Sequence, residues 1–357
     1  MRIAVLTNAY PPQARGGAGR IAALQVELLR RQGHEVRVWT TSLGWTVCPA
    51  WKRLGFHLRD LGWIHPVAKE IIDWKPETLL THNLTGAGFR TPSALQRQGI
   101  CWLHVLHDVQ LFHPVGLLQN EQPVSVLQRI VTGLRKPIFG RPDVVMSPTD
   151  WLLQAHVRRG WFQGCERVVV PNPALESTVA QTRDWGTPLK LLFVGRVSPD
   201  KGKNVLLELM QSAPRPIAWQ VVGAGATALQ TVVLPVGSSL TAFEETTPEI
   251  VLEHMRAADA LLVLSQIEEN QPTVLLEAFA SGLPAVAQAK GGIPETLGSA
   301  GLVVHSSEAS DWWRAIERLT TEPRAVWSAR AVEAWKRHAP ERVVEVLLGL
   351  LKSNKKI

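Results

Sequence analysis

The chain has 357 residues, of which 45% are hydrophobic and 19% are charged. This length exceeds what one hydrophobic core normally serves, so we expect a soluble globular protein of two domains. No apolar run approaches the roughly 20 residues that span a bilayer, and the start, Met1 to Asn8, predicts a β-strand and not a signal peptide. The three cysteines have no metal-ligand spacing and are expected to be reduced thiols in a cytoplasmic protein.

The net charge of +7 comes entirely from the first half of the chain. Residues 1–185 contain 21 Lys or Arg against 13 Asp or Glu, whereas residues 186–357 contain 17 against 18. Such an asymmetry favours an anionic partner, which is a nucleic acid, an anionic membrane or an anionic substrate. Nucleic acid is the weakest of these, because the sequence has no zinc finger, RNP-like motif or dense basic helix.

Short apolar runs alternate with helical patterns along the whole chain. In the first half we expect strands at 2–7, 35–40, 77–82, 100–106, 143–147 and 167–170. Helices are expected between them at 17–31, 66–73, 87–98, 124–135 and 149–159. After a linker rich in proline and glycine, strands are expected at 189–194, 217–222, 232–236, 260–264, 284–288 and 301–304. The helices of this half are expected at 203–211, 247–257, 273–281 and 308–320, followed by a helical tail at 323–352.

Strands that alternate with helices predict βαβ units and parallel sheets. We therefore predict an α/β protein of two doubly wound, Rossmann-like domains with a cleft between them. The N-terminal domain is expected over 1–175 and the C-terminal domain over 176–330. The tail 331–357 is expected to be helical, and a path back to the N-terminal domain is left open. In such sheets ligands bind outside the carboxyl ends of the strands.

Two glutamates eight residues apart, Glu269 and Glu277, flank a predicted helix start. Glu269 lies in the loop after the apolar run 260–264, and Glu277 lies just over one turn into the helix that Pro272 opens. The two carboxylates and the N–H groups of the first helical turn are therefore expected to face one crevice. Read alone, the pair fits a general acid and base. With the helix start between them, it suits a ligand that carries sugar hydroxyls and a phosphate.

Two cations follow the strand 189–194, in the stretch from Gly195 to Gly202. Arg196 and Lys201 are placed to hold a diphosphate, the arginine as a fork and the lysine as a point charge. A solvated turn before a helix is the plain alternative. A second glycine-rich turn, Arg15 to Arg20, joins the first strand to the first helix, where Gly17 allows a phosphate to approach the backbone.

Polar pairs end two strands of the N-terminal domain. His107 and Asp108 follow the fourth strand, where a histidine is able to donate to a sugar hydroxyl or a phosphate. His82 and Asn83 repeat the pattern, more weakly, after the third strand. His104 lies on the opposite face of its strand from His107, so we expect a buried core histidine there.

The motifs stand in the order of a known family. From Gly195 to Glu295 the chain carries Gly-Arg-x4-Lys-Gly, then E-x7-E, and then Gly-Gly-Ile-Pro-Glu at 291–295. The paired glycines of the last motif allow tight backbone packing near a nucleotide, although a plain strand-to-helix turn explains them equally well. Over roughly residues 1–320 the chain resembles the family-four retaining glycosyltransferases of the GT-B fold, known as group 1 enzymes of bacterial polysaccharide and lipopolysaccharide synthesis.

The resemblance implies transfer of a sugar from a nucleotide-diphosphate sugar to an acceptor hydroxyl of a glycan or a lipid-linked molecule, with retained anomeric configuration. It implies no cofactor, and the sequence has no D-x-D motif to suggest a metal. It implies that Arg196, Lys201, Gly17 and the amides of Thr273 and Val274 bind the diphosphate. Glu269 would contact the donor sugar, Glu277 the ribose, and His107 the sugar and the reacting phosphate. The acceptor side would include Asp108, His82 and Asn83.

One departure concerns specificity, because Gln271-Pro272 stands where many relatives have Phe-Gly. Two other functions stay open, namely a sugar-nucleotide epimerase of similar architecture and a binding scaffold that has lost catalysis. The segment 44–65 combines tryptophans with basic residues, which suits either an anionic membrane surface or a helix packed on its own domain. We therefore expect a cytoplasmic protein, with a peripheral site at the inner face of the cell membrane left open.

Overall fold

The structure is a computed structural model that describes residues 1–12, 17–41, 55, 59–113, 126–177, 183–244 and 247–354. The chain divides into two compact units. The first unit comprises Met1–Pro173 and Pro340–Ile357, and the second comprises Ala174–Ala339. Among the described residues, no helix is both long enough and apolar enough to cross a bilayer.

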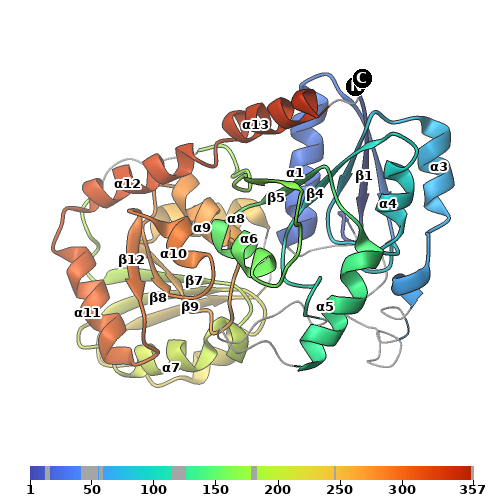
Figure 1. The fold of residues 1–357 in the computed structure, drawn as a ribbon. Coiled ribbons are helices and arrows are strands. Elements are labelled where there is room, and N and C mark those ends of the chain that lie inside the picture. Colours follow the sequence, from blue (N-terminus) through green and yellow to red (C-terminus); the bar gives the residue numbers. More distant parts are fainter. Residues whose placement is uncertain are drawn as a thin grey trace. The chain divides into compact units, whose positions relative to one another are not determined.

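A six-stranded parallel sheet forms the centre of the first unit, in the order β2-β1-β3-β4-β5-β6. Figure 1 labels β1, β4 and β5 of this sheet. Its strands are β1 (Arg2–Thr7), β2 (Glu35–Thr40), β3 (Thr78–Thr81), β4 (Cys101–Val105), β5 (Val144–Ser147) and β6 (Glu166–Val169). Its helices are α1 (Gly17–Arg31), α3 (Val67–Trp74), α4 (Thr91–Gln96), α5 (Val126–Phe139), α6 (Asp150–Val157) and α13 (Pro340–Ser353). The strands β3, β4 and β5 are buried throughout, as expected where helices cover both faces of a parallel sheet.

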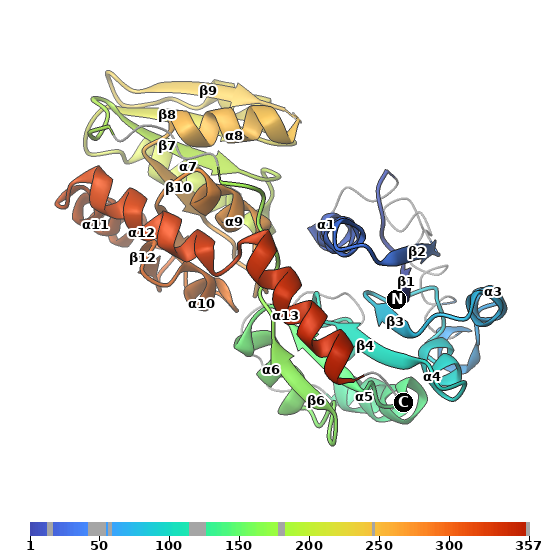
Figure 2. The same ribbon diagram turned by 90° about the horizontal axis from the view of Figure 1, so that it is seen from above.

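The two faces of this sheet carry separate cores. On one face, α1 and α13 pack against alternate residues of β1 such as Ile3 and Val5. On the other face, α3, α4 and α6 pack against Ala4 and Leu6. Figure 2 shows α1 and α13 on one side of the strands and α4 and α5 on the other. This division follows from the two-residue period of strand side chains.

The second unit repeats the plan with the strand order β12-β11-β10-β7-β8-β9, again all parallel. Its strands are β7 (Leu189–Val194), β8 (Ile217–Val222), β9 (Ser239–Phe243), β10 (Ala260–Val263), β11 (Ala285–Gln288) and β12 (Gly301–Val304). Its helices are α7 (Lys203–Gln211), α8 (Pro248–Ala257), α9 (Thr273–Ala280), α10 (Ile293–Leu297), α11 (Ala309–Thr320) and α12 (Arg324–Lys336). The predicted α/β fold of two doubly wound, Rossmann-like domains is confirmed, whereas the cleft between them stays a prediction.

One predicted strand is wrong. The residues 232–236 form no strand, and the outermost strand is β9, which pairs with β8. Pro235 has no N–H to donate to a strand ladder, and Val233 and Val236 are 83% and 97% exposed. The residues of β9 alternate between exposed and half-buried, because an edge strand covers little of the core. Its sequence therefore lacks the continuous apolar run that marks the inner strands.

The predicted helical tail is two helices. The α12 helix belongs to the second unit, and α13 packs on the sheet of the first unit beside α1. The chain leaves the helical path between them just before Pro340, a residue type that disfavours helical backbone in the position that precedes it.

Each sheet has one place where the connections reverse direction. It lies between β1 and β3 in the first unit and between β7 and β10 in the second. At such a point the loops after the two strands separate and leave a crevice at their carboxyl ends, where ligands of open α/β sheets bind. The residues that follow these four strands are therefore the first candidates for a site.

Candidate functional site

In the second unit, the turn after β7 packs closely on the end of β10. Gly202 has a φ of 87°, and a Cβ atom placed on it would lie 2.2 Å from the carbonyl oxygen of Leu264. The N–H of Gln266 donates to the carbonyl of Asp200 at 2.8 Å. Only glycine permits both this backbone conformation and this approach. The turn therefore brings Lys201 to the loop that carries Glu269.

Lys201 and Glu269 form an ion pair at the switch point of the second sheet. The Lys201 ammonium donates to Oε1 of Glu269, and the hydroxyl of Ser265 donates to the same oxygen at 2.7 Å. The two charged side chains are 29% and 17% exposed, so their attraction is screened less than that of a surface pair. The sequence predicts that these two residues face one crevice, but it does not predict that they touch. Ser265 was missed, and its place just after β10 was the signal for it.

A glycine pair supports the backbone of Glu269 from the other side. The N–H of Gly292 donates to the carbonyl of Glu269 at 2.7 Å, and the N–H of Gly291 donates to the carboxylate of Glu268. A Cβ atom on Gly291 would lie 2.1 Å from the carbonyl oxygen of Glu269, and its φ is 58°. The glycines pack tightly on the main chain of Glu269 and hold it in place, whereas their place near a nucleotide stays a prediction.

The α9 helix starts four residues after Glu269. Pro272 occupies the N-cap position with extended backbone, so the helix begins at Thr273, one residue later than a proline in the first turn would place it. The N–H groups of Thr273 and Val274 belong to the first helical turn, which has no acceptors of its own within the helix. Glu277 lies in the second turn of α9 and is 8% exposed. The loop carboxylate, helix start and helical carboxylate are therefore consecutive parts of one segment.

Arg196 does not join the ion pair. Its side chain is 67% exposed and pairs with Asp200 at 3.2 Å. Of the two cations predicted to face the crevice, the structure brings Lys201 to Glu269 and leaves Arg196 exposed beside Asp200. An arginine with this much exposure keeps the rotamer freedom to reach a ligand, at the cost of ordering its side chain on binding.

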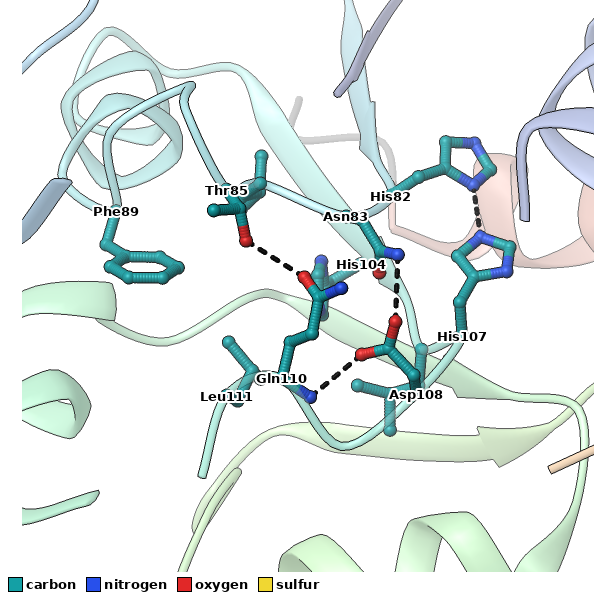
Figure 3. A pocket seen from close by; sticks show the side chains of 11 residues that line it. His82, Asn83, Thr85, Phe89, His104, His107, Asp108, Gln110 and Leu111 are labelled. Atoms are coloured by element: carbon teal, nitrogen blue, oxygen red, sulfur yellow. Dashed lines mark hydrogen bonds between the residues drawn. The ribbon is translucent and has the colours of Figure 1, made fainter. Parts of the chain in front are cut away.

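In the first unit, the residues after β3 lie beside those after β4 (Figure 3). Nδ1 of His82 lies 2.8 Å from Nε2 of His107, and the side-chain amide of Asn83 donates to Asp108 at 3.0 Å. The backbone N–H of Asn8, just after β1, donates to the carbonyl of Asn83 at 2.9 Å across the switch point. The structure therefore brings together the four polar residues that the sequence had placed at two separate strand ends.

Burial governs the protonation of this cluster. It lowers the pKa of His107 to about 4 and the pKa of His82 well below 6.5, so both rings are neutral at pH 7. It raises the pKa of Asp108 to about 6, against the hydrogen bonds from the backbone of Gln110 and the side chain of Asn83. The cluster lines a cavity of about 20 Å³, which is room for one water molecule.

Two further predictions concern this unit. Gly17, which is predicted to let a phosphate approach the backbone, is exposed at the start of α1. Arg15 and Gly16 of the same predicted turn lie outside the described residues. His104 is 4% exposed, its Nδ1 lies 2.8 Å from the hydroxyl of Thr81, and its ring packs edge-on to Phe139. The expected core histidine is confirmed.

Comparison with known proteins identifies the class. Residues 15–174 match the model of Glycosyltransferase Family 4, and residues 188–322 match that of Glycosyl transferases group 1. A solved structure of HepE from Anabaena in complex with UDP superposes with a TM-score of 0.69 at 17% identity, covering 99% of this chain and 100% of that one. The two Rossmann-like units are thus those of a GT-B glycosyltransferase.

Proteins of similar sequence point to the same class. The chain is 31% identical over 389 residues to D-inositol 3-phosphate glycosyltransferase of Rhodococcus jostii (strain RHA1), covering 95% of the chain and 85% of the relative. It is 24% identical over 333 residues to an uncharacterized 42.6 kDa protein in the cps region of Klebsiella pneumoniae, covering 83% of the chain and 87% of the relative. Alignments to several other D-inositol 3-phosphate glycosyltransferases span 58–60% of those relatives. The chain belongs to the group 1, family 4 glycosyltransferases.

Proposed function

We propose that this glycosyltransferase moves a sugar from a nucleotide-diphosphate sugar to an acceptor hydroxyl with retained anomeric configuration, in the synthesis of cell-surface polysaccharide or lipopolysaccharide. The contact between Lys201 and Glu269 carries the proposal, because it sets a cation for phosphate beside a carboxylate for sugar hydroxyls at a switch point. The relative from a cps region supports the polysaccharide setting. Retention rests on the family resemblance.

We propose that the bound donor separates Lys201 from Glu269 and contacts both side chains. Its diphosphate binds the Lys201 ammonium and accepts hydrogen bonds from the N–H groups of Thr273 and Val274. The exposed Arg196 side chain then reorients to contact the diphosphate as well. A hydroxyl of the donor sugar then donates to Glu269 in place of the lysine. As the bond to the sugar breaks, negative charge grows on the leaving diphosphate, and the cation and the helix start stabilise that charge.

The nucleoside end is proposed to meet Glu277, whose carboxylate accepts hydrogen bonds from the two ribose hydroxyls. The UDP in the HepE structure makes a uridine nucleotide the first donor to test. In the N-terminal unit, we assign contacts with the donor sugar and the reacting phosphate to His107, and phosphate approach to Gly17. Asp108, His82 and Asn83 form the acceptor side.

A thermal-shift screen of UDP-, GDP- and ADP-sugars tests the donor assignment. A donor at about 100 times its Kd should stabilise the protein by about 2.7 kcal/mol, and one base should stand out. Glu277→Ala should abolish that shift and Glu277→Gln should weaken it, whereas the exposed control Glu253→Ala should keep it. Equal shifts for all three bases, or an undiminished shift in Glu277→Ala, contradict the assignment. Conversion of the donor sugar without an acceptor points to the epimerase instead.

We also propose that the protein binds an anionic membrane surface. Of the segment 44–65, the residues Trp45, Trp51, Lys52, Arg53 and Phe56 lie outside the described residues. Arg59 is described, and its guanidinium stacks 4.1 Å from the ring centroid of Trp63. A second feature supports the proposal, because α5 exposes three apolar side chains one turn apart. These are Val126, Ile130 and Leu134, which are 73%, 54% and 54% exposed.

The charge on α5 matches this partner. The helix contains Arg129, Arg135 and Lys136 and no carboxylate. Arg129 is exposed and Lys136 is half-buried, whereas Arg135 is buried and donates to the carbonyl of Gln110. An exposed apolar stripe with cations beside it suits the interface of a bilayer that contains anionic lipid.

Co-sedimentation with vesicles tests the membrane proposal. We expect binding to vesicles rich in phosphatidylglycerol at low salt, weaker binding at high salt, and little binding to phosphatidylcholine alone. Ile130→Glu should weaken binding, whereas Val346→Glu, an exposed apolar position on α13 of the same unit, should not. A protein that stays in the supernatant at low salt, or an Ile130→Glu variant that binds fully, contradicts the proposal.

A further inference from the structure

The hydrogen bond between His82 and His107 constrains where each ring carries its hydrogen. The bond joins Nδ1 of His82 to Nε2 of His107 at 2.8 Å (Figure 3). A neutral imidazole has one N–H donor and one acceptor nitrogen, so one of the two bonded nitrogens carries a hydrogen and the other does not. Both rings are neutral at pH 7, since burial lowers both pKa values. Two arrangements are therefore open, and they place the hydrogen of His107 on opposite sides of its ring.

The second nitrogen of His82 distinguishes the arrangements. His82 is 1% exposed, and its Nε2 has no hydrogen-bond partner among the residues that the structure describes. If Nε2 carried the hydrogen, a buried N–H donor would lack an acceptor and would bear the full desolvation penalty of that group. With the hydrogen on Nδ1 instead, Nε2 presents only a lone pair, and buried acceptors without a partner are more common than buried donors without one.

We propose that His82 is a positioning residue, which donates from Nδ1 to Nε2 of His107 and so holds His107 as the tautomer with its hydrogen on Nδ1. His107 then acts as a donor through Nδ1. Any oxygen that contacts this nitrogen must therefore accept, whether it belongs to the protein or to a ligand such as a sugar or a phosphate. Ring orientation is set together with the tautomer, as when a carboxylate or carbonyl holds the far nitrogen of a functional histidine. The consequence for turnover rests on the proposed function, whereas the tautomer does not.

The fold explains why His82 is suited to this role. It directly follows the buried strand β3, whereas His107 lies two residues beyond the end of β4, in the loop that leads to Asp108. Because β3 and β4 are paired in parallel, with Thr81 opposite His104, the two histidines leave the same edge of the sheet. Asp108 is itself held by Asn83 at 3.0 Å, which ties the same two loops together a second time.

Nitrogen NMR of the full-length protein labelled with ¹⁵N-histidine tests the tautomer without any substrate. Two-bond ¹H–¹⁵N spectra at pH 7 should show both His82 and His107 protonated at Nδ1. His82→Asn keeps an amide donor near the position of Nδ1 and should leave the pattern of His107 unchanged. His82→Phe keeps a ring but removes the donor, so His107 should shift toward the Nε2-protonated form. His107 protonated at Nε2 in the unaltered protein, or unchanged in His82→Phe, overturns the inference.

Kinetics separate this inference from the proposed function. His82→Phe should lower kcat about 10- to 100-fold, by analogy with the residues that orient metal-binding histidines, with little change in the KM for donor. His82→Asn should turn over faster than His82→Phe, because its amide keeps the donor to His107. If His107→Phe is inactive but His82→Phe turns over normally, the positioning role is wrong. If His107→Phe itself transfers sugar normally while the NMR pattern is as expected, the role assigned to His107 in the reaction fails and the tautomer assignment stands.

Discussion

Replacement of Lys201 by methionine is expected to lower kcat about 10²–10³-fold, the range observed when one group that stabilises developing negative charge is removed. Methionine retains much of the side-chain volume but carries no charge, so the leaving diphosphate loses its cation while the turn keeps its packing. The effect should fall mainly on kcat, because charge on the diphosphate grows as the sugar departs. Steady-state transfer assays with the donor found by thermal shift measure it.

Two comparisons sharpen this result. Lys203, two residues along on α7, is a matched control, and its replacement by methionine should change kcat by less than about threefold. Glu269→Gln removes the charge of the partner and should also reduce turnover, since Glu269 is assigned to the donor sugar. If the Lys201→Met enzyme is as active as the Lys203→Met enzyme, the placement of the diphosphate at this turn is wrong.

Removal of the Asp259 carboxylate is expected to destabilise the second unit strongly. It is fully buried, and its Oδ1 accepts from Arg183 at 2.5 Å while its Oδ2 accepts from the N–H groups of Gly186 and Lys190 at 3.1 and 2.8 Å. Arg324, which is 4% exposed, lies 3.7 Å from the same carboxylate. Asp259→Ala would leave a buried guanidinium without its counter-charge and two backbone donors without an acceptor.

The expected loss for Asp259→Ala is about 3–5 kcal/mol of unfolding free energy, which is typical when one partner of a buried ion pair is removed. Urea unfolding followed by tryptophan fluorescence measures it, because this unit contains several buried tryptophans. Asp184→Ala, an exposed neighbour in the same segment, should change stability by less than about 0.5 kcal/mol. A loss below about 1 kcal/mol for Asp259→Ala would show that the guanidinium groups relax into solvent.

Much of the fold was predictable because short sequence patterns specify its strands and helices. Inner strands such as 2–7 and 189–194 agree with β1 and β7 residue for residue, and the helices 17–31 and 203–211 agree with α1 and α7. Buried parallel strands appear as continuous apolar runs, and amphipathic helices appear as a 3.6-residue period. The edge strand β9 was missed because its five residues, Ser239–Phe243, include two polar ones and form no continuous apolar run.

The candidate site was predictable only in part. Motif spacing and strand ends pointed to Lys201, Glu269, Glu277 and His107, since each follows or adjoins a recognisable strand or helix start. Spacing did not reveal that Lys201 meets Glu269 whereas Arg196 turns to Asp200. That difference depends on the close approach of Gly202 to β10, a contact between segments about 60 residues apart in sequence.

The sequence by itself determined the class of fold, the family and which polar residues lie at strand ends, because apolar period and motif order are properties of short segments. Only the tertiary structure decided which of those residues touch. Lys201 with Glu269 and His82 with His107 are separated by 68 and 25 residues, and they meet because parallel pairing brings β7 beside β10 and β3 beside β4. Strand order is a property of the whole sheet, so the pairs that shape the chemistry of the site arise only once the sheets have formed.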